Sequence, residues 1–172
     1  MSWTRLAPSV RAALLLVVLV GHAAAGCLRP TLDEPPIAPP FVVRTVDGDA
    51  FSLAEERGRV VLLDFMATWC VPCRRQIPEF ADVHARRAGA GLVAVSIDVD
   101  PLEDEADLRA FRDELGVPWD FALDTDGARV LYDAVTLPKQ VLVDRDGRIA
   151  WETRPGEVVD GARLEREVLR LL

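Results

Sequence analysis

The feature that most restricts how this 172-residue chain can fold is an apolar run that follows Arg59 and ends at Met66, broken only by Asp64. A strand of this composition is buried on both faces, so its sheet must lie between two other layers. Residues 72–88 follow as a predicted helix, because Pro72 is tolerated in a first helical turn and glycines come after the last turn. The sequence therefore predicts a central strand that leads through a short turn into a helix.

Strand and helix patterns alternate along the rest of the chain. Two hairpins are expected, one around Asp47-Gly48-Asp49 and one around Asp146-Gly147, because each turn lies between short apolar segments. Strands separated by helices, with hairpins at both ends, indicate an α/β fold in which a mixed central sheet is covered by helices on both faces. The remaining predicted elements are strands at 92–97 and 119–123 and helices at 103–115, 128–134 and 158–172.

Residues 1–26 have the order of a secretory signal peptide. Two arginines precede an apolar run at 12–20, which is shorter than the roughly 20 residues that a membrane-spanning helix needs. Small residues then lead to Cys27 in an order that resembles a bacterial lipobox, so we expect Cys27 to carry a lipid that anchors the protein to a membrane. Cleavage after Ala25 is the alternative, and it would leave Cys27 as a free thiol.

A proline-rich segment at 27–40 separates this leader from the rest of the chain. Because it contains little that could join a core, we interpret it as an extended tether that reaches roughly 40 Å at about 3.1 Å per residue. A leader without a spacing role is the alternative. The globular domain is then expected at 41–172, and about 130 residues are enough to bury a core without a disulfide framework. The cysteines of this domain are therefore free for chemistry.

Charge narrows the choice of partners. Residues 27–172 carry 18 basic and 28 acidic residues, a formal charge of −10. This acidic excess argues against a nucleic-acid partner. With the signal peptide, we expect an exported protein that works in a periplasm or on the outer face of a membrane, and we expect a monomer.

Cys70 and Cys73 are the candidate catalytic residues. They lie where the buried strand ends and the helix begins, so Cys70 is close to unpaired backbone N–H groups and the positive end of the helix dipole, which favours a thiolate. With this spacing one sulfur attacks a substrate disulfide and the other resolves the mixed disulfide. The same spacing is also half of a zinc site, but His84 alone cannot supply the missing ligands, so no metal is expected.

Two motifs in this order resemble the TlpA/ResA-like thiol-disulfide oxidoreductases of the thioredoxin superfamily. Residues 60–73 are similar to that family's central strand and redox motif, and Thr136-Leu137-Pro138 before 141–147 is similar to its cis-proline loop and closing hairpin. The resemblance covers nearly everything after Phe41, and residues 98–124 match the extra strand and helix of this branch. It implies a thioredoxin-like three-layer sandwich with an N-terminal β-hairpin. No cofactor is implied beyond a redox-active disulfide.

Two departures from the family pattern concern substrate choice more than chemistry. Gln76 stands where this branch commonly has a glutamate, and Lys139-Gln140 replaces the usual threonines after the cis-proline.

Asp64 is the candidate proton acceptor. Burial of a carboxylate in a strand that is covered on both faces raises its pKa, which suits proton exchange with Cys73 near neutral pH. The resemblance implies the same role. An aspartate that serves only local hydrogen bonds is the alternative.

Three further residues are candidates for substrate binding. The resemblance implies a cis bond before Pro138, which would leave the backbone of Leu137 able to pair with an extended substrate segment beside Cys70. Trp69 is interpreted either as a lid over the cysteines or as a packed aromatic residue.

The resulting hypothesis is an extracytoplasmic enzyme that reduces disulfides of envelope client proteins, such as apocytochrome c or proteins with metal-site cysteines. The resemblance implies a membrane thiol-disulfide transporter as its electron donor. A thiol peroxidase is an alternative, although it would need threonine where Ala67 stands. A copper-handling binding module of related fold is another, although no histidine lies near the second motif.

Overall fold

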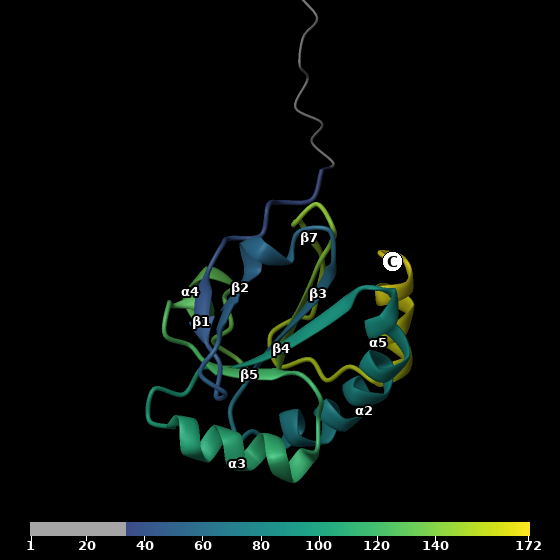
Figure 1. The fold of residues 1–172 in the computed structure, drawn as a ribbon. Helices are drawn as coiled ribbons and strands as arrows, with labels where there is room; N and C mark the ends of the chain where they lie inside the picture. The colour runs from purple at the N-terminus through teal and green to yellow at the C-terminus, as the bar shows by residue number, and fades with distance from the viewer. Residues whose placement is uncertain (1–33) are drawn as a thin grey trace, which may run out of the picture. The chain divides into compact units, whose positions relative to one another are not determined.

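The computed structural model describes residues 34–172, and one compact unit spans Pro35–Leu172 (Figure 1). The predicted signal peptide and Cys27 lie outside the described residues. The strands are β1 (Val42–Arg44), β2 (Ala50–Ser52), β3 (Val60–Met66), β4 (Leu92–Asp98), β5 (Asp120–Leu123), β6 (Lys139–Val143) and β7 (Ile149–Glu152). The helices are α2 (Val71–Arg87), α3 (Glu105–Leu115), α4 (Ala128–Leu131) and α5 (Gly161–Leu169), with short 3-10 turns η1 (Leu53–Glu56) and η2 (Ala88–Ala90).

Five strands form a mixed sheet in the order β5-β4-β3-β6-β7. Strand β3 runs parallel to β4 and antiparallel to β6, and β4 runs parallel to β5. All residues of β3 are buried, as its apolar sequence predicts for a strand in the middle of a sheet. Strands β1 and β2 form a separate antiparallel hairpin. The expected mixed sheet and N-terminal hairpin are therefore confirmed.

The sheet separates two apolar layers because successive side chains point to opposite faces. Leu62 and Met66 lie in one layer with residues of α2, α3 and α5. Leu63 and Phe65 lie in the other, with the hairpin and α4. Figure 1 shows α2 and α5 on one side of the sheet and β1, β2 and α4 on the other. Helices therefore cover both faces, and the hairpin shares the second face with α4.

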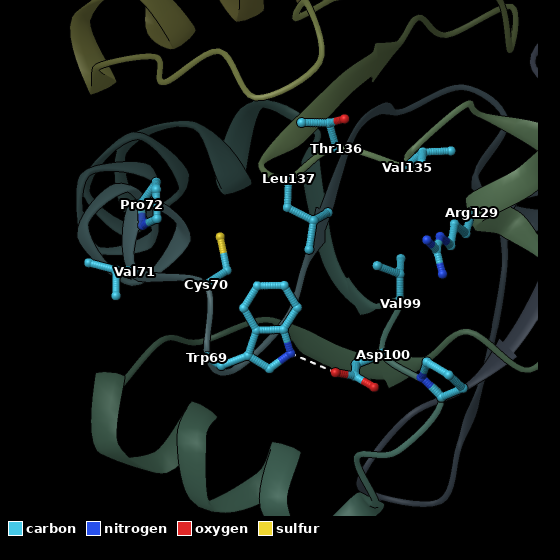
Figure 2. A pocket seen from close by; sticks show the side chains of 11 residues that line it. Trp69, Cys70, Val71, Pro72, Val99, Asp100, Arg129, Val135, Thr136 and Leu137 are labelled. Atoms are coloured by element: carbon cyan, nitrogen blue, oxygen red, sulfur yellow. Dashed lines mark hydrogen bonds between the residues drawn. The ribbon is translucent and has the colours of Figure 1, made fainter.

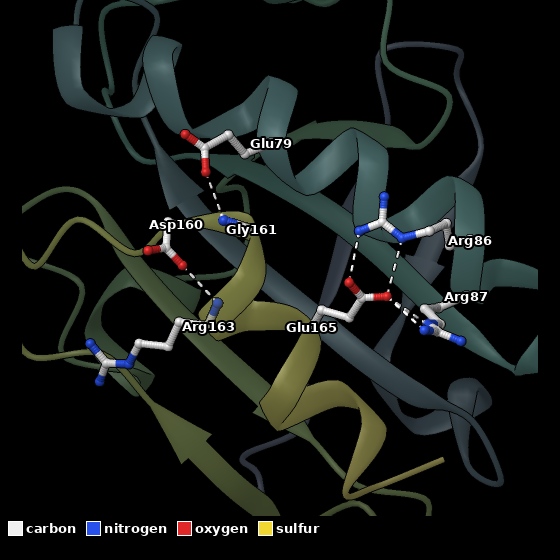
Figure 3. Close-up of polar contacts among 7 residues, drawn as sticks. All are labelled: Glu79, Arg86, Arg87, Asp160, Gly161, Arg163 and Glu165. Atoms are coloured by element: carbon white, nitrogen blue, oxygen red, sulfur yellow. Dashed lines mark hydrogen bonds and ion pairs between the residues drawn. The ribbon is translucent and has the colours of Figure 1, made fainter.

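Helix α5 is fixed to α2 by polar contacts at its start and along its length (Figure 3). The N–H of Gly161 donates to Glu79 at 2.7 Å, and a side chain on Gly161 would meet the Glu79 carbonyl oxygen at 3.0 Å, so glycine permits this close approach. Glu165 accepts hydrogen bonds from Arg86 at 2.9 Å and Arg87 at 2.7 Å. These hydrogen bonds lower the pKa of Glu165 to about 2.

The folded unit includes residues 35–40, which the sequence assigns to the tether. The N–H of Ile149 donates to the Pro36 carbonyl at 2.9 Å, and the Tyr132 hydroxyl donates to the Pro39 carbonyl at 2.7 Å. The proline-rich segment thus supplies acceptors to donors of the domain, which a composition argument does not anticipate. The folded domain begins within the segment expected to be tether.

Several helix ends differ from the expected ones, among them the start of α3 at Glu105 rather than 103 and the end of α5 at Leu169 rather than 172. Helix α5 begins after Asp160 rather than at 158, because the Asp160 side chain caps the helix by accepting from the Arg163 N–H at 2.7 Å. Helix α4 ends at Leu131 rather than at 134, and Asp133 has a left-handed φ of 50° that a helix does not contain. Within residues 34–172, no helix is both long enough and apolar enough to cross a membrane.

Candidate active site

Cys70 and Cys73 lie where β3 ends and α2 begins, and they form a disulfide with their Cα atoms 5.3 Å apart. Cys70 is the N-cap residue of α2, and its sulfur accepts the backbone N–H of Cys73 at 3.3 Å. Unpaired N–H groups and the helix dipole at this end stabilise negative charge on a sulfur at the cap position. Cys70 is therefore placed to be the attacking thiolate, as expected from the sequence.

A cavity of about 570 Å³ opens beside Cys70 (Figure 2). Cys73 does not line it and is only 1% exposed. Cys70 is itself only 3% exposed, so what separates the two cysteines is that Cys70 lines the cavity and Cys73 does not. The cavity is lined by Trp69, Cys70, Val71, Pro72, Val99, Asp100, Pro101, Arg129, Val135, Thr136 and Leu137.

Trp69 lies at the mouth of this cavity and is 63% exposed. Its indole N–H donates to the Asp100 carboxylate at 2.6 Å, the contact drawn in Figure 2. Hydrogen bonds from the Leu102 backbone and from Trp69 lower the pKa of Asp100, so the carboxylate stays ionised and holds the ring. Trp69 is thus not packed in the core.

The loop before β6 supplies the opposite wall of the cavity. The bond between Leu137 and Pro138 is cis, as the family resemblance implies. Within residues 34–172, the N–H and C=O of Leu137 make no hydrogen bond to another backbone group. These groups are therefore free to pair with an extended segment that reaches Cys70.

Asp64 forms a polar row with two residues on neighbouring strands. Ser96 of β4 and Gln140 of β6 are its register partners, so all three side chains lie on the face that α2 covers. The Ser96 hydroxyl donates to Asp64 at 3.0 Å, and the Gln140 amide donates to it at 2.9 Å. The Ser96 oxygen in turn accepts the indole N–H of Trp119 at 3.0 Å.

Burial decides the acidity of Asp64. The side chain is 2% exposed, and this desolvation raises its pKa to about 6, although the hydrogen bonds from Gln140 and Ser96 act in the opposite direction. The local hydrogen bonds that the sequence left as an alternative are present, but they do not cancel the effect of burial. Asp64 can therefore gain or lose a proton close to neutral pH.

Comparison with known proteins places this arrangement in a family. Residues 36–152 match the AhpC/TSA family. The chain belongs to the AhpC/TSA family. Thiol-disulfide oxidoreductase ResA of Bacillus subtilis is 30% identical over 149 residues, covering 81% of this chain and 80% of that protein. Thioredoxin-like protein YneN of Bacillus subtilis is 30% identical over 145 residues, covering 80% of this chain and 85% of that protein.

Solved structures of thiol-disulfide proteins share the fold of this chain. A thiol:disulfide interchange protein of the thioredoxin family from Chlorobium tepidum superposes with a TM-score of 0.72 at 26% identity, covering 80% of this chain and 97% of that chain. A Bacteroides thetaiotaomicron protein described as a putative protein disulfide isomerase gives 0.72 at 29% identity, covering 80% and 89%. The thioredoxin-like fold is thereby confirmed. The protein is a thiol-disulfide oxidoreductase of the ResA/DsbE type, with Cys70 and Cys73 as its redox pair.

Ser96 and Gln140 are partners of Asp64 that were not predicted from the sequence. Ser96 was visible as a polar residue within an apolar strand, the same signal that singled out Asp64, whereas Gln140 follows Lys139 just before the apolar run and was noted only as a departure from the family pattern. What the sequence lacked was the register between β3, β4 and β6, which alone shows that the three side chains meet.

A second acidic group supports the turn before Cys70. Glu103 accepts hydrogen bonds from the N–H of Thr68, at 3.1 Å, and from its hydroxyl. The pKa of the neighbouring Asp98 is raised to about 8. Burial is the main cause, and a hydrogen bond with Glu103 adds to it. The sequence did not point to these contacts, which join residues far apart in the chain. Among residues 34–172, no group of three or more His, Cys, Asp or Glu side chains is arranged to hold a metal ion.

Proposed function

We propose that this thiol-disulfide oxidoreductase reduces disulfides of client proteins outside the cytoplasm. The observation that carries the proposal is the arrangement of three groups: Cys70 opens to a cavity, Cys73 is buried behind it, and Asp64 titrates near neutrality on the same face of the sheet. Together these groups supply a nucleophile, a resolving thiol and a proton acceptor.

The reaction starts from the dithiol form. The Cys70 thiolate attacks one sulfur of a client disulfide, forming a mixed disulfide, and the other client sulfur leaves as a thiolate that takes up a proton. Cys73 then transfers its proton to the Asp64 carboxylate and attacks the Cys70 sulfur. The second client sulfur leaves and is protonated by Asp64. The client gains two electrons and two protons, and the enzyme is left with the Cys70–Cys73 disulfide seen in the structure.

Client binding uses the walls of the cavity. The backbone of Leu137 pairs with an extended client segment, a short form of strand addition that positions the client sulfur beside Cys70. Trp69 covers that segment from the opposite rim, where Asp100 holds it. Recognition through backbone groups accepts many sequences, which suits clients such as apocytochrome c or proteins with metal-site cysteines.

The electron donor and the cellular location of the enzyme follow from the same proposal. In an oxidising compartment the disulfide cannot be reduced again by small thiols, so a membrane thiol-disulfide transporter supplies the electrons. A lipid on Cys27 keeps the enzyme beside that donor, on a periplasmic or outer membrane surface.

The test is to capture clients on a Cys73→Ser variant of the full chain. This variant retains the nucleophile and lacks the resolving thiol, so mixed disulfides through Cys70 should accumulate in the cell envelope. The matched control is Cys70→Ser, which should capture none. Equal capture by both variants, or capture by neither, contradicts the proposal.

A further inference from the structure

The chain has only two glutamines, and both are buried beside the redox site. Gln76 lies on α2, and its amide nitrogen donates to the Gln140 side-chain oxygen at 3.3 Å. The Gln140 amide nitrogen donates to Asp64 at 2.9 Å. These three side chains form a continuous hydrogen-bonded chain from the sheet to the redox helix.

The direction of this chain is fixed from the Asp64 end. An ionised carboxylate only accepts hydrogen bonds, so Gln140 must present its NH₂ group to Asp64. The Gln140 oxygen then faces Gln76, and Gln76 must present its own NH₂ group in return. The Gln76 oxygen is left over. It is buried and has no hydrogen-bond partner among the described residues.

A buried acceptor without a donor calls for a physical explanation, and a donor that forms only in another redox state of the protein supplies one. Gln76 lies one turn after Cys73 on the buried face of α2, so the two side chains are neighbours. In the disulfide form the Cys73 sulfur carries no hydrogen. Reduction of the disulfide by a dithiol donor adds two electrons and one proton when Cys70 remains a thiolate, and that proton makes Cys73 an S–H donor.

We propose that the Gln76 side-chain oxygen accepts a hydrogen bond from the Cys73 S–H group in the reduced enzyme. Gln140 is a positioning residue in this arrangement: it is anchored by Asp64, which is also the proton acceptor of the proposed reaction, and it holds the Gln76 amide in the orientation that leaves its oxygen available. The inference rests on the proposed function and names what stabilises its dithiol form. It also connects the two departures from the family pattern, since Gln76 and Gln140 contact each other.

The first test is the infrared S–H stretching band of Cys73. A full-length Cys27→Ser, Cys70→Ala protein has Cys73 as its only thiol, and its band should lie at a lower wavenumber than that of cysteine in water. Adding Gln76→Met should return the band to the higher wavenumber, and Gln140→Met should do the same or broaden it. Deuterium exchange identifies the band.

Ser96→Ala is the matched control for Gln140→Met. Each change removes one hydrogen bond donated to Asp64, but only Gln140 contacts Gln76. Ser96→Ala should therefore leave the S–H band in place. A band that Gln76→Met does not move, or that Ser96→Ala moves as far as Gln140→Met, overturns the proposal.

The second test is the equilibrium of the Cys70–Cys73 pair with glutathione. Gln76→Met removes a bond of the dithiol form and an unpaired acceptor of the disulfide form, and both effects favour the disulfide. The equilibrium should shift toward the disulfide by about twofold to tenfold. No shift, or a shift toward the dithiol, contradicts the inference. If Gln76→Met does not fold, Gln140→Met carries both measurements.

Client capture by the Cys73→Ser variant separates this inference from the proposed function. If the Cys73→Ser variant captures no client while the S–H band behaves as expected, only the proposed function is overturned. Capture with an unmoved S–H band would overturn the role of Gln76 alone.

Discussion

The ionised form of Asp64 is disfavoured in the folded protein. Its pKa rises from the ordinary 3.8 to about 6, so the folded state binds a proton more tightly than the unfolded state does. The free energy of unfolding therefore falls as the pH rises from about 4 to about 6, by about 3 kcal/mol for a shift of this size. Below pH 4 the carboxyl is neutral in both states and this difference disappears.

Replacing the carboxyl by a neutral amide should remove this pH dependence. Asp64→Asn is expected to raise the free energy of unfolding by about 1 to 3 kcal/mol at pH 8 and to have little effect at pH 4. Denaturant unfolding of the disulfide form between pH 4 and pH 8 measures this change in the free energy of unfolding. Asp82 is exposed, so Asp82→Asn is the control and should leave the free energy of unfolding unchanged at both pH 4 and pH 8. Equal stabilisation at pH 4 and pH 8 would contradict the burial argument.

The same substitution should slow catalysis. Without Asp64 no buried carboxylate accepts the Cys73 proton, so resolution of a mixed disulfide on Cys70 should slow by about 100-fold. In the unaltered enzyme this rate should rise as the pH passes about 6, where Asp64 ionises, and the variant should lose that rise. Stopped-flow release of a fluorescent thiol gives both results. Unchanged rates between pH 5 and 9 would leave Asp64 a structural role only.

At the scale of elements, the start of α2 makes two chemically identical side chains inequivalent. Cys70 caps the helix and lines the cavity, whereas Cys73 lies one turn inside and faces the core. Charge stabilisation by the helix end falls off within the first turn, so it acts mainly on Cys70. The element, rather than either residue, therefore predicts Cys70 as the nucleophile and Cys73 as the resolving thiol.

Alkylation should reveal this difference. In the reduced protein Cys70 should react with iodoacetamide before Cys73, because it is both reachable and favoured as a thiolate. Peptide mass spectrometry at short reaction times gives the order, and the Cys70→Ser and Cys73→Ser variants report each thiol alone. Faster labelling of Cys73 would reverse the assignment.

For the whole molecule, the balance between dithiol and disulfide sets the direction of electron flow. Val71 and Pro72, between the cysteines, supply neither a charge nor a side-chain hydrogen-bond donor to the Cys70 thiolate. Its stabilisation comes from the backbone and the helix dipole, as in the more reducing members of the superfamily. The whole protein should therefore act as a reductant.

The expected reduction potential lies below about −200 mV. Equilibration of the purified protein with glutathione buffers of known ratio, followed by quantification of the two forms, measures it. Val71→Ala is a matched variant that should leave the potential nearly unchanged, since neither side chain is charged. A potential above about −150 mV would make the protein an oxidase or an isomerase partner instead.

Local patterns in the sequence were sufficient for much of this description. An apolar run broken only by Asp64 must be buried on both faces, which predicted the central strand and the layered fold before any contact was known. The position of the redox motif between that strand and a helix predicted which cysteine attacks. A carboxylate in such a strand must be desolvated, which determined the raised pKa of Asp64. Each of these conclusions depends on a residue and its neighbours in sequence.

Only the tertiary structure decided what requires contact between distant segments. The register of β3, β4 and β6 brings Ser96 and Gln140 to Asp64 and leaves the oxygen of Gln76 without a partner. Residues 35–40 joined the domain because their carbonyl groups meet donors far along the chain. Hydrogen bonds of this kind depend on strand pairing, and pairing is set by the packing of the whole sheet rather than by the composition of any one segment.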